Sequence, residues 1–160
     1  TEARPAAAGG GDEVVVPAEG LRPREQQPRA AEVGPSAESR LQLAQAHFRD
    51  FAENSRTGMW IEDVQSGGLL YVSPAFERIW GLEAAGLYAR PTLRLESVHP
   101  EDRPRVAAAL AQVVAGRELA EEYRVRRPDG SVLWVWDRAV PVRDFDGRVQ
   151  RVVGLAEDIT

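Results

Sequence analysis

Residues 119–160, with the sequence LAEEYRVRRPDGSVLWVWDRAVPVRDFDGRVQRVVGLAEDIT, decide the fold class of this chain. They contain three runs rich in β-branched and aromatic residues, which are residues 119–127, 132–143 and 149–159. Short turns that contain Asp129-Gly130 and Asp146-Gly147 separate the runs. Because an Asp-Gly pair between strand-like runs is a strong hairpin signal, the stretch predicts three consecutive antiparallel strands.

A further hairpin is predicted nearer the N-terminus. Residues 59–63 and 69–73 are strand-like, and a turn containing Gly67-Gly68 joins them. A short helix should follow, with Ser73 as its cap, proline at its first position and Gly81 at its end. Five strands with helices between them favour an antiparallel sheet covered by helices on one face, which is an α+β fold.

Two longer helices complete the expected order of elements. Residues 37–54 carry apolar side chains at three- and four-residue spacing, which predicts an amphipathic helix. The apolar stripe consists of Leu41, Ala44, Phe48 and Phe51. His99-Pro100 is expected to open the second helix, because proline is favoured in the first turn, and Gly116 to end it. Residues 82–97 are expected to form short turns or single helical turns.

Composition excludes several classes of function. The chain of 160 residues has no cysteine, only two histidines and a net charge of −5, and all 20 basic residues are arginine. Disulfides, thiolate metal sites, multi-histidine metal centres and a lysine Schiff base are therefore excluded. The negative charge argues against nucleic acid as a partner.

The composition also changes along the chain. Residues 1–36 hold five of the 11 prolines and no aromatic residue, so we expect a disordered linker there. No apolar run approaches the roughly 20 residues that span a bilayer, which indicates a cytoplasmic chain without a membrane segment. Because the chain opens at Thr1 and its only methionine is Met59, we expect a fragment of a longer protein.

Several segments in this order resemble the PAS domain, in the subclass with a PAC motif that is common in bacterial sensor kinases and cyclic-dinucleotide enzymes. They are residues 71–76, 98–103, 122–135, 141–147 and 154–160. The resemblance implies a five-stranded antiparallel sheet of order 2-1-5-4-3, with helices that enclose a pocket against one face. Residues 55–160 would then be the PAS sensory domain, which is not an enzyme.

The family pattern places a set of side chains toward the pocket. They are Trp60, Glu62, Tyr71, Phe76, Trp80, Tyr123, Val125, Val135, Asp137, Ala139 and Ala156. We favour a bulge that moves Asp137 to the surface, beside Arg138 or Arg124; the alternative is a polar anchor in the pocket. Glu62 likewise lies either at the surface or in the pocket as a polar anchor. If these two acids face inward, the pocket should prefer a small, largely apolar molecule or one with a cationic or hydrogen-bond-donating group. Carboxylates should bind poorly, unless Arg90 or Arg94 lines the pocket.

The same pattern places Trp134 and Trp136 on the outer face of the sheet. The stripe of the helix at residues 37–54 is the expected cover, either folded back onto its own sheet or shared between two chains of a homodimer. Asp158, Ile159 and Thr160 match the family's exit signature, which leads to a C-terminal output domain.

Cofactor chemistry has little support in the sequence. The absence of cysteine excludes a covalent flavin adduct, and His99 lies at the start of its helix, off the inward stripe, which argues against haem. His47 belongs to the N-terminal helix, outside the pocket.

We therefore expect a PAS sensory and dimerisation module of a multidomain signalling protein, first of all a sensor histidine kinase. A diguanylate cyclase or phosphodiesterase is the alternative parent. A third hypothesis is a ligand-free dimerisation scaffold, in which bulky aromatic side chains fill the pocket.

Overall fold

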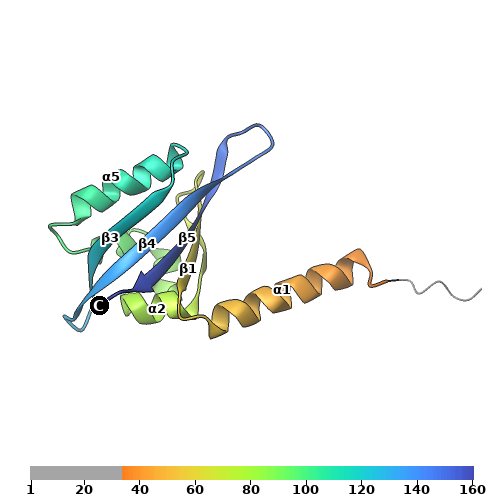
Figure 1. Ribbon diagram of the computed structural model, residues 1–160, viewed down its shortest axis with the longest axis horizontal. Helices are drawn as coiled ribbons and strands as arrows, with labels where there is room; N and C mark the ends of the chain where they lie inside the picture. Colours follow the sequence, from red (N-terminus) through yellow and green to blue (C-terminus); the bar gives the residue numbers. More distant parts are fainter. Residues whose placement is uncertain (1–33) are drawn as a thin grey trace, which may run out of the picture. The chain divides into compact units, whose positions relative to one another are not determined.

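The computed structural model of the chain describes residues 34–160, so most of the linker expected at residues 1–36 lies outside the described part. Five strands form a single antiparallel sheet of order β2-β1-β5-β4-β3 (Figure 1). The strands are β1 (Gly58–Asp63), β2 (Leu69–Val72), β3 (Leu119–Arg126), β4 (Val132–Arg143) and β5 (Val149–Asp158). The expected sheet order is confirmed, and each strand boundary lies within one residue of its predicted position.

Five helices accompany the sheet in the described residues. They are α1 (Ala37–Asn54), α2 (Pro74–Trp80), α3 (Ala84–Ala89), α4 (Leu93–Glu96) and α5 (Arg103–Val114). Helix α2 begins where the sequence predicts, because the Ser73 hydroxyl accepts a hydrogen bond from the Phe76 amide at 3.3 Å. It ends at Gly81, whose φ of 67° is the left-handed conformation that glycine adopts without strain.

Helix α5 begins at Arg103 and not at His99-Pro100, so the predicted start is wrong. The His99 amide donates to the Arg124 carbonyl at 2.8 Å, and Val98 pairs with Val125 as an isolated bridge. These bonds hold residues 98 and 99 against β3, and the chain turns before the helix starts.

The core lies between one face of the sheet and helices α2 to α5. Trp60, Trp80, Tyr123 and Phe76 are the largest side chains that are fully buried. The rings of Phe76 and Trp80 stack with their centroids 3.9 Å apart. Burial of these aromatic side chains supplies much of the apolar area that stabilises a domain of this size.

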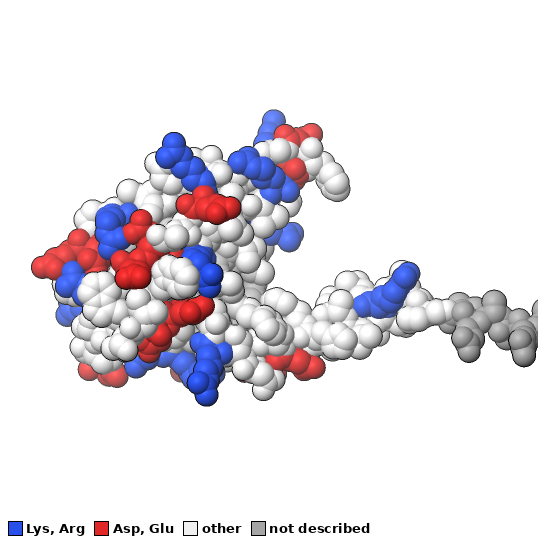
Figure 2. Space-filling model, viewed as in Figure 1, with Lys and Arg blue, Asp and Glu red and all other residues white. Residues whose placement is uncertain are grey.

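The other face of the sheet carries exposed apolar side chains. Trp134 is 44% exposed, and Leu155 and Val140 of the neighbouring ladder are also exposed. The guanidinium carbon of Arg138 lies 4.1 Å from the centroid of the Trp136 ring, which leaves that tryptophan half-buried. On the face seen in Figure 2, acidic and basic side chains are interspersed.

Helix α1 meets this outer face only at β2 and does not cover Trp134 or Trp136. All four residues of the predicted stripe are exposed, and Ala52 is the buried residue of the helix. The Phe48 ring meets the Tyr71 ring of β2 edge to face, with their centroids 5.3 Å apart. The expectation that α1 folds back over Trp134 and Trp136 of its own sheet is therefore wrong for the single chain.

Candidate functional site

Asp137 is a fully buried carboxyl group on β4. Its Oδ2 accepts a hydrogen bond from the Tyr123 hydroxyl at 2.7 Å, and its Oδ1 accepts one from Trp60 Nε1 at 3.3 Å. The bulge that we favoured is absent at this position, because the register of β4 against β5 shifts only between Val142 and Arg143. Strand alternation therefore keeps Asp137 inside, and the surface interpretation is wrong.

The groups around Asp137 shift its pKa in opposite directions. Burial raises the pKa of the Asp137 carboxyl, while the nearby charge of Arg94 and the hydrogen bonds from Tyr123 and Trp60 oppose that rise. Burial, together with the neighbouring Asp137, raises the pKa of the Tyr123 hydroxyl well above its usual value. Tyr123 therefore remains a protonated hydrogen-bond donor at neutral pH.

Arg94 of α4 is the residue that sequence reasoning placed only as an alternative. It is 6% exposed, and its guanidinium carbon lies 3.7 Å from the centroid of the Trp60 ring. Its Nη2 donates to Glu62 Oε2 at 3.3 Å, while Nη1 is buried without a hydrogen-bond partner among residues 34–160. The expectation that only Asp137 and Glu62 bring charge to the interior is therefore incomplete.

The opposite side of Trp60 rests on backbone. Trp60 pairs with Gly154 of β5, and a Cβ atom at Gly154 would overlap the indole ring. Glycine at this position lets the ring lie flat over the strand, between the β5 backbone and the Arg94 guanidinium.

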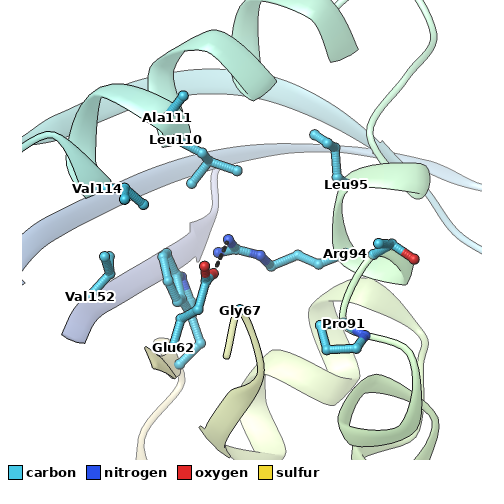
Figure 3. Close-up of a pocket in the computed structure, with 11 residues that line it drawn as sticks. Glu62, Gly67, Pro91, Arg94, Leu95, Leu110, Ala111, Val114 and Val152 are labelled. Carbon is cyan, nitrogen blue, oxygen red and sulfur yellow. Dashed lines mark hydrogen bonds and ion pairs between the residues drawn. The ribbon is translucent and has the colours of Figure 1, made fainter. Parts of the chain in front are cut away.

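A cavity of about 260 Å³ opens beside Arg94 (Figure 3). Its polar side chains are Glu62, Arg94 and Thr92. Its apolar wall comes from β1, β5, the segment around α4 and helix α5, and consists of Trp60, Pro91, Leu95, Leu110, Ala111, Val114 and Val152. In Figure 3 the Arg94 side chain extends from α4 across the space toward Glu62.

The residues predicted for the pocket separate into three groups. Trp60 and Glu62 line the cavity. The largest group is buried in the neighbouring core and comprises Phe76, Trp80, Tyr123, Val125, Val135, Asp137, Ala139 and Ala156. Tyr71 is placed wrongly, because it pairs with Ile61, whereas the inward Trp60 pairs with Val72. Tyr71 therefore faces the side of the sheet where it meets Phe48.

The exit residues form a compact hydrogen-bonded end to β5. Asp158 Oδ1 accepts from the Thr160 amide at 3.0 Å and from its hydroxyl at 2.6 Å, which lowers the pKa of Asp158. The Trp134 amide donates to Thr160 Oγ1 at 3.0 Å, and the Ile159 amide donates to the Trp134 carbonyl at 2.9 Å. The end of the chain is thus joined to β4.

The two histidines lie away from the cavity lining. His99 is half-buried, and its Nδ1 accepts from the Glu101 amide at 3.3 Å. His47 is exposed on α1. Residues 34–160 contain no group of three or more metal-ligating side chains, and none of their helices is long and apolar enough to cross a membrane.

A family profile described as the PAS fold matches residues 69–156, which is more than half of the chain. This chain belongs to the PAS family. The PAS domain is 33% identical over 126 residues to the C4-dicarboxylate transport sensor protein DctS of Rhodobacter capsulatus, a match that covers 78% of the chain and 19% of the relative. Across the curated relatives it matches, the chain spans only 14–19% of their length.

Solved structures of sensor proteins share the PAS fold of this chain. A sensory box histidine kinase/response regulator from Burkholderia thailandensis is 34% identical, with a TM-score of 0.55 over 76% of this chain and 85% of that one. The N-terminal domain of a diguanylate cyclase with a PAS/PAC sensor, from Marinobacter aquaeolei, is 27% identical, with a TM-score of 0.59 over 64% and 94%. The chain is thus a non-catalytic PAS sensory module that resembles those of sensor histidine kinases.

Proposed function

We propose that the cavity beside Arg94 is the sensory site of this PAS domain, and that its occupancy by a small molecule controls a sensor histidine kinase. The observation that carries the proposal is the charged Arg94 side chain, which is buried at the edge of a cavity and has one guanidinium nitrogen without a hydrogen-bond partner among residues 34–160. Such an arrangement has a desolvation cost and contributes little to stability, so it favours a binding role.

The proposed signal leaves through β4 and β5 to an output domain that follows residue 160 in the parent protein. Asp137 pairs with Ala156, and the same ladder continues to the Val135–Asp158 pair. A ligand that moves the Arg94 guanidinium changes the positive charge felt by Asp137. The β4–β5 ladder then connects Asp137 to the exit residues.

A diguanylate cyclase remains the second candidate parent, supported by the Marinobacter relative. The ligand-free scaffold has support in the filled space around Phe76 and Trp80, where aromatic stacking replaces a pocket. The cavity beside Arg94 favours a ligand over that scaffold.

The proposal also includes the cellular setting. We place the domain in the cytoplasm as a homodimer, without nucleic acid as a partner and without haem or flavin. A cavity of about 260 Å³ lies below the range of about 300–1,000 Å³ typical of drug-sized ligands, which supports a small metabolite over a macrocyclic or tricyclic cofactor.

The test is a thermal-shift screen of small metabolites with the full chain, preceded by a visible absorption spectrum to check for a chromophore. Val114→Trp should fill the mouth of the cavity, and Val142→Trp is the matched control, since the two valines are 41% and 39% exposed. A true ligand raises the melting temperature of the wild type and of Val142→Trp, and fails to stabilise Val114→Trp. If no metabolite stabilises the wild type, or if all three proteins respond alike, the proposed function is wrong.

A further inference from the structure

The Arg94 guanidinium has an unmet hydrogen-bond donor in the interior. Nη1 is buried and has no partner among residues 34–160, and the side chain as a whole is only 7% exposed. Buried polar groups in native proteins nearly always have partners, and Arg94 lines the cavity, so its unmet donor favours a bound acceptor there. A guanidinium binds a carboxylate best, because its parallel N–H groups match the two oxygens.

Glu62 lies directly beside this donor. Its Oε2 accepts from Arg94 Nη2 at 3.3 Å, and its side chain keeps about a quarter of its exposure, so it can accept a further donor from the cavity. A bare carboxylate on Arg94 would place two negative groups next to each other. A ligand that also carries an ammonium group would pair with Glu62 and keep the charges of the site balanced.

The rest of the cavity is apolar. Leu110 and Val114 of α5 and Val152 of β5, the cross-strand partner of Glu62, form an apolar wall of the cavity (Figure 3). A charged group placed against that wall would lose its hydration without gaining a partner. The third part of the ligand should therefore be a small hydrocarbon group.

We propose that this cavity binds an α-amino acid with a small apolar side chain, with its carboxylate on Arg94, its ammonium on Glu62 and its side chain against Leu110, Val114 and Val152. The inference rests on the proposed sensory function of the same cavity and names its ligand class. It replaces the expectation of a simple cationic ligand, because an amine alone would leave Arg94 Nη1 without an acceptor.

Isothermal titration calorimetry on the full chain tests the three contacts with compounds that share one carbon skeleton. L-Valine has all three groups, 3-methylbutanoate lacks the ammonium, and 2-methylpropylamine lacks the carboxylate. We expect L-valine or L-leucine to bind, and each analogue to bind at least about tenfold more weakly, as loss of a hydrogen bond to a charged group implies. Succinate should bind more weakly than 3-methylbutanoate, because its second carboxylate meets the apolar wall.

Two variants assign the contacts to residues. Arg94→Gln should weaken L-valine and 3-methylbutanoate alike, by about tenfold or more. Glu62→Gln should weaken L-valine and spare 3-methylbutanoate, so that the preference for the amino acid disappears. Arg90→Gln is the matched control, because Arg90 pairs with Glu96 on the surface and should leave all affinities unchanged.

The outcomes separate the two proposals. If Arg94→Gln fails to fold by circular dichroism, the change of preference in Glu62→Gln decides the matter on its own. If the metabolite screen finds a ligand and L-valine and L-leucine do not bind, the amino-acid inference is overturned and the sensory function stands. If equal binding of L-valine and 3-methylbutanoate is found, the contact with Glu62 is refuted. If no metabolite binds at all, both proposals fail.

Discussion

Two aspartates, Asp102 and Asp137, show how position in this fold sets the state of a carboxyl group. Asp137 is fully buried, and burial raises its pKa. Asp102 lies between α5 and β3, where hydrogen bonds from Arg124 lower its pKa to about 2. The two residues should therefore respond to pH with opposite signs.

For Asp137 the folded state holds its proton more tightly than the unfolded state, whose pKa is 3.8. Its contribution to stability is present below that value and is lost as pH rises through the raised folded pKa. Asp137→Asn stays neutral, so its free energy of unfolding should gain on that of the wild type as pH rises. Between pH 3.8 and the raised folded pKa, the difference in free energy of unfolding between Asp137→Asn and wild type should grow by about 1.4 kcal/mol per pH unit.

Urea unfolding of both proteins between pH 4 and 8 measures this gain. Asp129→Asn is the control: hydrogen bonds from Ser131 lower the pKa of Asp129 from 3.8, so its difference from wild type should stay constant between pH 4 and 8. A difference between wild type and Asp137→Asn that does not change with pH would show that Asp137 is ionised throughout.

Asp102 should stabilise the fold through its bonds to Arg124. Its Oδ2 accepts from Arg124 Nε at 2.9 Å and from the Arg124 amide at 3.0 Å, and its Oδ1 accepts from Nη2 at 2.9 Å. Because the folded pKa is lowered, this stability is present above pH 3.8 and is lost as pH falls through about 2. Asp102→Ala should cost about 1–2 kcal/mol at pH 7, the size expected for a partly buried charged hydrogen bond.

Glu101→Ala is the matched control for the same arginine. Glu101 also pairs with Arg124, at 2.8 Å, but its side chain is 72% exposed. An exposed ion pair contributes about 0–1 kcal/mol, so chemical unfolding should show a smaller loss for Glu101→Ala. An equal or larger loss would contradict the role assigned to Asp102.

At the scale of elements, the strands were predictable because their signals are local. Asp129-Gly130 and Asp146-Gly147 mark the hairpins, and Gly130 and Gly147 adopt φ of 87° and 80° as such turns require. The position of α4 was not predictable, because four residues carry no periodicity that shows which side faces inward. Arg94 sits between Leu93 and Leu95, and nothing in that local pattern distinguishes it from a surface arginine.

The surface position favoured for Asp137 is wrong for a different reason. The alternation of residues along β4 places Asp137 on the inward face, but bulges often break this alternation, which favoured the surface position. The bulges of this sheet lie at Ile61/Glu62 and Val142/Arg143. Whether a strand keeps its register depends on the partner strand, which a local pattern does not reveal.

At the scale of the whole molecule, the outer sheet face and the α1 stripe remain exposed in the single chain. Phe51 is 65% exposed and Trp134 44% exposed, so a second copy of the chain is the expected cover. Trp134→Ser and Phe51→Ser should each shift the sedimentation profile of the chain toward monomer. Phe145→Ser, at a fully exposed turn, is the control and should leave self-association unchanged.

Wild-type protein that sediments as a monomer at its highest soluble concentration would refute the homodimer. If both variants still dimerise, the interface lies on another surface of the domain.

The position of Asp137 within β4 has a mechanical consequence. Successive residues of a strand point to opposite faces, so the buried Asp137 is flanked by Trp136 and Arg138 on the outer face. At this position only the β4 backbone separates the buried face of the sheet from its outer face. A rotation of the peptide planes on either side of Asp137 tilts the side chains on both faces at once, in opposite senses. A change at Asp137 can therefore move the side chains of Trp136 and Arg138 on the outer face through the β4 backbone alone, without a series of contacts across the core.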